Sequence, residues 1–341
     1  MSNVLICSHE EADYGFYMMY DGLCCVLGDK HVVTYPFNKT YYGMVADDYL
    51  QDNGQPGYTA PTECMIPRDP MDMNLSIYDV VANLLSKKFD LIVFGPRSHS
   101  VKALRDIIDR VERKKLPPVV FAEFEDYDTL RQDWMTEFKP DVCFKRETLT
   151  SNFQTYSKQR IYPMPFSAVL GPYTDLPDCP KDIDIFFACG NTFDLREKVL
   201  VEVKRLAEKH QWNFVGGGNE FRLNYADYHK HIRRAKIGIS VRGWGRDTVR
   251  YWEIPSHPTL LVAGKFDLAI PDPFTHNETA AFFKEDLSDL EDILYTYLTD
   301  DVYRTHVAKC GHEHLKKHHT TEARARYMLE AIRLTTGVAV C

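Results

Sequence analysis

Residues 236–264 read KIGISVRGWGRDTVRYWEIPSHPTLLVAG, and the organisation of the whole chain can be worked out from this stretch. Ile237, Ile239 and Val241 alternate with small or polar residues, which is typical of a strand. A loop with two glycines follows, then a short stretch that suits a helix, and then a second apolar run. The predicted elements are a strand at 237–241, a loop at 242–246, a helix at 248–254 capped by Asp247 or Thr248, and a strand at 259–263.

The loop and the helix start of this stretch have the composition of an anion-binding site. Gly243 and Gly245 let the backbone approach a ligand closely. Free N–H groups and the helix dipole both favour negative charge at a helix start. Glu253 is a carboxylate that can accept two hydrogen bonds from a diol. Together with the cationic side chains, these groups indicate binding of a nucleotide diphosphate through its phosphates and its ribose. The cationic side chains are Arg242, Arg246 and Arg250.

The first half of the chain also alternates between strands and helices, which indicates an α/β fold with a parallel sheet. The stretch at 36–74 shows no clear period and is typical of a functional loop. Its Tyr41, Tyr42 and Tyr58 are candidates to stack on a sugar or a base. The predicted strands are 4–7, 31–35, 89–95, 119–122 and 141–144, and the predicted helices are 14–27, 77–88 and 101–111.

A proline-containing segment at 160–177 is predicted to link this half to a second one. We therefore expect two domains, residues 1–165 and 166–341, each long enough to bury its own core. Besides the stretch at 236–264, the second half is predicted to contain strands at 183–188 and 212–215 and helices at 196–210, 225–235 and 322–334.

Composition and charge exclude several classes of protein. A formal net charge of −8 over 341 residues disfavours a nonspecific polyanion binder. Nine cysteines without a repeating spacing indicate a reducing compartment. The N-terminus enters a predicted strand without a signal-peptide pattern, and no apolar run approaches the roughly 20 residues that a membrane-spanning helix needs. We therefore expect a cytoplasmic protein without a membrane span.

The second half resembles a known family. The run DxxRYWEIP at 247–255, the buried strand after it and IPDPF at 270–274 are similar to the C-terminal half of group 1 glycosyltransferases, most closely the CgeB-type (spore maturation protein-like) branch. The resemblance continues through an acidic helix at 287–298, an HVAKCG turn at 306–311 and HTTEARARYMLE at 319–330, and weaker counterparts in the first half are FDLIVFG and VCFKRE. It implies a GT-B-like fold, in which two Rossmann-like domains with parallel sheets face each other across a cleft. It also implies that the last helix, 322–334, packs back on the first domain.

The resemblance assigns residues to a donor site on the second domain. Gly190, Asn191 and Arg196 match a turn that supplies amides and a basic side chain to the donor diphosphate. Glu253 matches the second glutamate of a pair that retaining members carry eight positions apart, and this residue holds the ribose hydroxyls. The partner position here is Gly245, so a retaining outcome is not implied, and Asp247 is a partial substitute. The implied donor-binding residues are Gly190, Asn191, Arg196, Arg242, Gly243, Gly245, Arg246, Asp247, Arg250 and Glu253.

The catalytic base is expected on the first domain, opposite the donor. Ligands of open α/β sheets bind at the carboxyl ends of the strands, and the loop at 8–13 leaves the first predicted strand there. His9 is the leading candidate because its ordinary pKa is nearest neutral pH, with Asp13 as an alternative or as its orienting partner. Glu123, Glu125 and Asp126 follow the strand at 119–122 and are further candidates to serve as the base or to bind acceptor hydroxyls. Lys145-Arg146 are candidates to face the phosphates across the cleft.

Two patterns suggest a metal site instead. Asp126-Tyr127-Asp128 and Asp182-Ile183-Asp184 have the DxD spacing of metal-dependent glycosyltransferases with another fold. The histidine-rich stretch around His314 and His318 has zinc-ligand spacing, although a solvated helix face has the same pattern. The GT-B resemblance implies neither a metal nor a cofactor, because the nucleotide-sugar is a co-substrate.

We therefore expect a metal-independent glycosyltransferase, hexosyl or pentosyl, that uses a nucleotide-sugar such as a UDP-sugar. Its acceptor is left open between a saccharide, a protein, a small metabolite and a modified nucleic-acid base. The alternatives are a non-catalytic nucleotide- or glycan-binding protein on the same fold and a GT-B-type epimerase.

Overall fold

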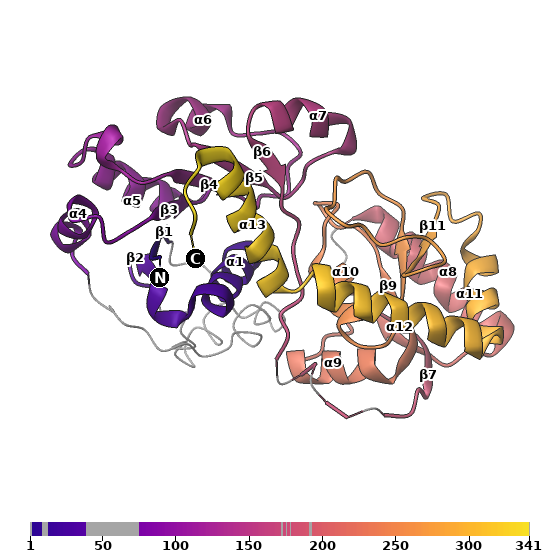
Figure 1. Ribbon diagram of the computed structural model, residues 1–341. Coiled ribbons are helices and arrows are strands. Elements are labelled where there is room, and N and C mark those ends of the chain that lie inside the picture. The colour runs from indigo at the N-terminus through magenta and orange to yellow at the C-terminus, as the bar shows by residue number, and fades with distance from the viewer. Residues whose placement is uncertain are drawn as a thin grey trace.

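Two α/β domains lie side by side in the computed structural model (Figure 1). The structure describes residues 2–8, 13–38, 75–171, 173–174, 176–177, 179–190 and 193–340. Each domain is built on one sheet whose described strands are all parallel, and most of the connections between them contain a helix. This arrangement confirms the predicted fold class of two parallel-sheet α/β domains.

The first sheet has the strand order β2-β1-β3-β4-β5-β6. Its residues are buried on both faces, as expected for a parallel sheet covered by helices. Val4 and Ile6 face one apolar layer, whereas Leu5 and Cys7 face the other, because successive side chains of a strand point to opposite faces. The strands are β1 (Val4–Cys7), β2 (Val32–Tyr35), β3 (Leu91–Phe94), β4 (Val119–Glu123), β5 (Val142–Lys145) and β6 (Ile161–Pro163).

Strand β6 corrects the predicted linker. The segment 160–177 was expected to be a connection throughout, yet its first residues add a sixth strand to the sheet beside β5. Three residues that end in a proline are too short to show a period, so only pairing with β5 identifies them as a strand.

The helices of the first domain begin at recognisable caps where the sequence provides them. Asp13 accepts a hydrogen bond from the amide of Phe16 at the start of α1 (Tyr14–Leu27). Ser76 and Asp79 form a capping box at the start of α4 (Ile77–Leu85). The sequence did not predict α6 (Gln132–Phe138) or α7 (Thr150–Lys158), because neither has a clear apolar face. Helix α6 buries only two side chains, and every residue of α7 is exposed or half-buried. The remaining helices are α5 (Ser98–Ile108), α6 (Gln132–Phe138) and α7 (Thr150–Lys158), with short 3-10 helices η1 (Asp29–His31) and η3 (Arg113–Lys115).

The second sheet has the strand order β11-β10-β9-β7-β8. The elements predicted from the stretch at 236–264 are present as a strand, a loop, a short helix and the neighbouring strand. The strands are β7 (Ile183–Ala188), β8 (Phe214–Gly217), β9 (Ala235–Ser240), β10 (Leu260–Gly264) and β11 (Ala281–Phe283). The helices are α8 (Asp194–His210), α9 (Tyr225–Arg234), α10 (Val249–Glu253), η4 (Ile254–Ser256), α11 (Leu290–Thr299) and α12 (Asp301–His318).

The turn expected at 306–311 is wrong, because these residues lie inside helix α12. Gly311 suggested a turn, but it serves close packing. A Cβ atom at this position would lie 2.2 Å from the carbonyl oxygen of Thr279, so only glycine lets the helix approach that backbone. Glycine inside a helix pattern therefore marked a helix contact here rather than a helix end.

The last helix, α13 (Thr321–Thr336), belongs spatially to the first domain. In Figure 1 the yellow C-terminal helix lies against the indigo α1. Met328 and Ile332 are fully buried in the apolar layer that also contains α1 and the first sheet. The hydroxyl of Thr321 donates to the carboxylate of Asp21 at 2.6 Å. The chain thus crosses back over the domain boundary before it ends.

Taken one by one, the helices that the structure describes lack either the length or the apolar character that crossing a bilayer requires.

Candidate functional site

A pocket of about 550 Å³ lies between the domains, at the carboxyl ends of the second sheet. Its lining follows the strands in turn, from the start of α8 after β7 to the loops after β9, β10 and β11. Thr150, at the start of α7, is the contribution of the first domain. Ligands of open parallel sheets bind at this edge. The lining residues are Thr150, Leu195, Arg242, Arg246, Gly264, Lys265, Phe266, Asp267 and Glu285.

One wall of the pocket is cationic. The guanidinium of Arg242 lies 4.6 Å above the ring of Phe193, and its Nη2 donates to the carbonyl of Trp244 at 3.2 Å. Burial lowers the pKa of Arg242, and the positive charge of Arg246 lowers it further. Arg246 forms a 3.3 Å ion pair with Asp128 of the first domain. An anion bound between these arginines would relieve their repulsion.

A second pair of arginines, with a carboxylate, lies beside the same strand ends. Burial lowers the pKa of Arg196 to about 10, with Arg250 as the next cause. Arg196 donates from Nε to the carbonyl of Arg242 at 3.0 Å and from Nη1 to the carbonyl of Gly190 at 3.1 Å. Arg196 therefore ties Gly190, just after β7, to the loop after β9. The Arg250 Nε is buried and has no hydrogen-bond partner among the described residues.

Glu253 is the carboxylate of this cluster. Burial raises the pKa of Glu253 to about 7, and the charge of Arg250 opposes the shift. Burial also raises the pKa of Tyr228, with Glu253 as the next cause. Glu253, Arg250 and Tyr228 thus form one electrostatic group, and the charge of Arg250 also acts on Cys189, which precedes Gly190.

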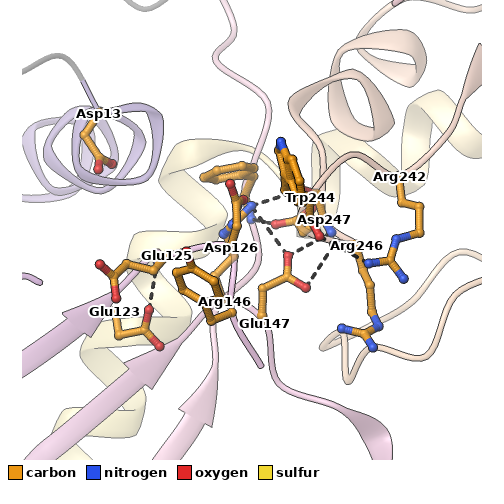
Figure 2. A network of polar contacts seen from close by, with 12 residues as sticks. Asp13, Glu123, Glu125, Asp126, Arg146, Glu147, Arg242, Trp244, Arg246 and Asp247 are labelled. Atoms are coloured by element: carbon orange, nitrogen blue, oxygen red, sulfur yellow. Dashed lines mark hydrogen bonds and ion pairs between the residues drawn. The ribbon is translucent and has the colours of Figure 1, made fainter. Parts of the chain in front are cut away.

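A network of polar contacts joins the loop after β9 to the first domain (Figure 2). The Glu147 carboxylate accepts hydrogen bonds from the amides of Arg246 and Asp247, both at 3.0 Å. Arg146 donates from Nη1 to the carbonyl of Asp247 at 3.0 Å and forms an ion pair with Asp126. The amide of Arg246, which was expected to serve the donor phosphates, is therefore taken by Glu147.

Asp247 has a structural role in this network. Its buried carboxylate accepts from the amide of Phe166 at 2.6 Å and from Nε1 of Trp252 at 2.8 Å. Both oxygens are thereby used to hold the interdomain connection against α10. Thr248, the other predicted cap, takes the N-cap position.

The two glycines of the loop make this contact between the domains possible. The Gly243 amide donates to the carbonyl of Gly245 at 3.0 Å, which closes a tight turn. A Cβ atom at Gly245 would lie 2.6 Å from Glu147 Oε1 and 2.7 Å from Asp126 Oδ1. Retaining members of the resembling family have a glutamate at this position. Here carboxylates of the first domain occupy the space that its side chain would need.

The candidate bases are in different surroundings. Asp13 caps α1 and pairs with Arg97 at 3.3 Å, and His9 lies outside the described residues, as do Asn191, Tyr41, Tyr42 and Tyr58. Glu123 is buried in an ion pair with Lys145 at the carboxyl ends of β4 and β5. Burial raises the pKa of Glu123, which Lys145 opposes. Lys145 and Arg146, the candidates to face the phosphates, are both buried and paired with first-domain carboxylates.

The patterns that suggested a metal have other partners. Asp126 and Asp128 pair with Arg146 and Arg246, respectively. Asp182 and Asp184 lie at the amino end of β7, away from the pocket edge, where they pair with Arg234 and Lys236. Within the described ranges, three or more metal-ligating side chains do not gather anywhere.

Sequence reasoning missed several residues of the site. Glu147 was noted only as part of the VCFKRE run, and Lys265, Phe266 and Glu285 were not considered. Each follows the end of a strand, namely β5, β10 or β11. Their position at the strand ends was the available signal, since the carboxyl ends of parallel strands meet at one edge.

Comparisons with known proteins agree with this architecture. A family model described as "Glycosyl transferase-like" matches residues 196–330. Solved structures that resemble the chain include glycosyltransferases with the GT-B fold, so the predicted GT-B-like architecture is confirmed.

Among them is a glycosyltransferase from Rickettsia africae ESF-5, with a TM-score of 0.58, 12% identity and coverage of 98% of both chains. Anabaena Alr3699/HepE, solved in complex with UDP and glucose, has a TM-score of 0.56 and 8% identity. The match covers 98% of this chain and 100% of Alr3699/HepE. TarM has a TM-score of 0.53 and 11% identity over 75% of this chain, which spans 58% of the length of TarM. A search of curated protein sequences found no match.

Proposed function

We propose that this protein transfers a sugar from a nucleotide-diphosphate donor to an acceptor that enters from the first domain. The observation that carries the proposal is the interdomain pocket of about 550 Å³ with Arg242 and Arg246 on its wall. Arg250 and Glu253 lie beside the same strand ends. Sugar transfer leaves negative charge on the departing diphosphate, and fixed cationic donors stabilise that charge.

The donor is proposed to span both groups of residues. Glu253 would accept hydrogen bonds from the ribose diol, and Arg196, Arg250 and the Gly190 turn would lie near the diphosphate. The diphosphate would then reach Arg242 and Arg246, and the sugar would extend past them into the pocket. The match of the family model to 196–330 supports this assignment, because it covers all of these side chains except the Gly190 turn.

The finer features of the donor and the family are part of the same proposal. A neighbour of similar fold was solved with UDP and glucose, which supports a UDP-hexose as the first donor to test. The DxxRYWEIP run supports membership of the CgeB-type branch. Metal independence is proposed because arginine side chains would already neutralise the diphosphate.

Binding of nucleotide-sugars tests the proposal directly. UDP-glucose, UDP-galactose, UDP-N-acetylglucosamine and GDP-mannose are titrated calorimetrically with and without EDTA. We expect one of them to bind in EDTA, and Arg250→Ala to weaken it by about 1.5–3 kcal/mol, the range for a hydrogen bond to a charged group. Arg205→Ala, which removes an exposed arginine paired with Glu202 on α8, is the matched control and leaves affinity unchanged.

Two results would contradict the proposal. If no nucleotide-sugar binds the folded protein, the donor site is wrong. If binding appears only with a divalent ion, metal independence is wrong. Incubation of the bound sugar without acceptor separates the alternatives, because an epimerase converts it and a non-catalytic binder leaves it unchanged even when acceptors are added.

A further inference from the structure

Two large aromatic side chains are exposed on loops that meet at the cleft. Trp244 is 72% exposed and Tyr127 is 68% exposed. Trp244 lies in the loop after β9, between two residues that line the pocket, Arg242 and Arg246. Tyr127 lies in the first-domain loop after β4. The two loops are in contact, because Asp126 Oδ1 would lie 2.7 Å from a Cβ atom placed on Gly245.

Both aromatic residues are held at the backbone while their rings face solvent. The carbonyl of Trp244 accepts from Arg242 Nη2 at 3.2 Å, and the carbonyl of Tyr127 accepts from Lys145 Nζ at 2.7 Å. On either side of Tyr127, Asp126 and Asp128 are anchored by arginines. Figure 2 shows the loop with Trp244 and Arg246 beside Asp126 and Arg146. Single exposed apolar residues are ordinary, but these two are fixed on contacting loops beside a polar pocket.

The carboxylates around the aromatic pair complete a particular chemistry. The side chains of Asp126 and Asp128 remain 54% and 38% exposed although each pairs with an arginine. A carboxylate offers about four acceptor positions, so each can also accept hydrogen bonds from hydroxyl groups. A pyranose ring has C–H bonds on a face that packs on an aromatic ring, whose face is electron-rich, and hydroxyls at its edge that donate to carboxylates.

We propose that Trp244 and Tyr127 form an acceptor subsite for a saccharide, with Asp126 and Asp128 receiving its hydroxyls. This deepens the proposed function, on which it rests, by choosing a carbohydrate from the possible acceptors. A saccharide fits better than a protein segment because the aromatic rings stand among charged side chains rather than in a contiguous apolar patch. The rings act as a rigid platform, since Trp and Tyr give large contact areas at low entropic cost.

Tryptophan fluorescence reports on this subsite selectively. The chain has four tryptophans. Trp134 and Trp252 are buried and Trp212 is half-buried, so Trp244 is the residue that acrylamide quenches most. Maltohexaose, cellohexaose, chitohexaose and mannohexaose are added to the full chain in the presence of UDP, and at least one should protect the fluorescence from quenching.

Variants then separate stacking from other effects. Trp244→Ala and Tyr127→Ala should each raise the dissociation constant of the protecting oligosaccharide by about 10-fold, within the range for loss of one stacked ring. Trp244→Phe should restore most of the affinity because a ring remains. Tyr78→Ala removes an aromatic side chain that is 75% exposed on α4 and is the matched control. Both alanine variants should bind UDP-glucose like wild type.

The outcomes are distinguishable. The subsite is wrong if none of the four oligosaccharides changes the quenching, or if both alanine variants bind them like wild type. It is also wrong if UDP-glucose protects Trp244 and Trp244→Ala weakens only that ligand, which would assign the ring to the donor. If an oligosaccharide binds but no nucleotide-sugar does, the proposed transfer fails and the saccharide subsite stands.

Discussion

At the scale of one residue, the burial of Glu253 affects how its carboxylate can bind the donor. Its pKa is raised to about 7 because the carboxylate is desolvated more strongly than Arg250 compensates. Only the ionised form offers acceptors on both oxygens to a diol. Donor binding should therefore become stronger as the pH rises through the pKa of Glu253.

The affinity for UDP-glucose should increase between pH 6 and pH 8 in the wild type and stay flat in Glu253→Gln. UDP-glucose is suitable because its diphosphate does not titrate in this range. At pH 8 the variant should bind more weakly by about 1–3 kcal/mol. Calorimetry at several pH values measures both effects, with Glu322→Gln on the exposed start of α13 as control. An equal pH dependence in Glu253→Gln would assign it to another group.

The same pKa has a consequence for stability. The pKa of Glu253 in the folded state, about 7, lies above the ordinary glutamate value of 4.5. Between these two pH values the folded state therefore holds a proton that the unfolded state has released. Wild type should therefore lose stability relative to Glu253→Gln as the pH rises from 4.5 to 7, by at most about 3 kcal/mol. Urea unfolding of both proteins at pH 5 and pH 7 measures this difference, and a constant difference would contradict it.

The proposed base remains at the loop of residues 8–13. His9→Ala should reduce transfer by about 100- to 10,000-fold, the usual loss for a general base, while UDP-glucose affinity stays close to that of wild type. The rival is Asp126, whose side chain is 54% exposed beside the loop after β9. If His9→Ala retains nearly full turnover and Asp126→Asn loses it even at saturating acceptor, the base belongs to the loop after β4.

At the scale of elements, the loop at 242–247 is shaped by the first domain. Glu147 occupies two of its amides, and Gly245 leaves room for that carboxylate. Arg242 and Arg246 therefore reach the pocket from a loop whose backbone is fixed from across the cleft. A single methyl group added at Gly245 should therefore displace Arg242 and Arg246 on the wall of the pocket.

Gly245→Ala should destabilise the protein by about 1–3 kcal/mol, because the new Cβ displaces Glu147 and leaves buried hydrogen-bonding groups unpaired. It should also weaken UDP-glucose binding through the displaced arginines. Gly264→Ala is the matched control for stability, since its Cβ would meet Phe283 at an ordinary 3.6 Å. Because Gly264 lines the pocket, Arg205→Ala is the control for binding. Thermal unfolding compares the two glycine variants and calorimetry compares Gly245→Ala with Arg205→Ala. Equal stability of the two glycine variants would contradict the role given to Gly245.

At the scale of the whole molecule, α13 completes the first domain after the chain has built the second. Its apolar side shares a core with α1, and Gly22 permits the contact. A Cβ atom at Gly22 would lie 2.1 Å from the backbone oxygen of Thr321, which cannot move without shifting the start of α13. The two domains are therefore connected both at Phe166 and at this helix.

Gly22→Ala should destabilise the protein by about 1–3 kcal/mol or more through overpacking, despite the better helix propensity of alanine. Urea unfolding should show the loss, and limited proteolysis should cut near α13 first. Cys25→Ala, at an exposed position of α1, the helix that contains Gly22, is the control. Protection of α13 equal to that of wild type would contradict the packing argument.

The sequence by itself determined the fold class and the order of most elements. Apolar alternation gives β9, short apolar runs give β1, β7 and β10, and helix-compatible apolar spacing gives α1, because these signals are local along the chain. It also identified the strand ends and the charged residues that follow them. Elements with a weak local signal, such as β6, α6 and α7, could be recognised only from their contacts with neighbouring elements in the structure.

Only the tertiary structure decided what those residues contact. Asp247, Arg146 and Glu123 read as ligands or bases in the sequence, yet each is buried in a contact that joins strands or domains. Glu147 and Gly245 are separated by about 100 residues, and their contact defines the shape of the donor loop. The physical reason is that a charged group's role depends on its burial and on its partner, and both are set by parts of the chain far away in sequence.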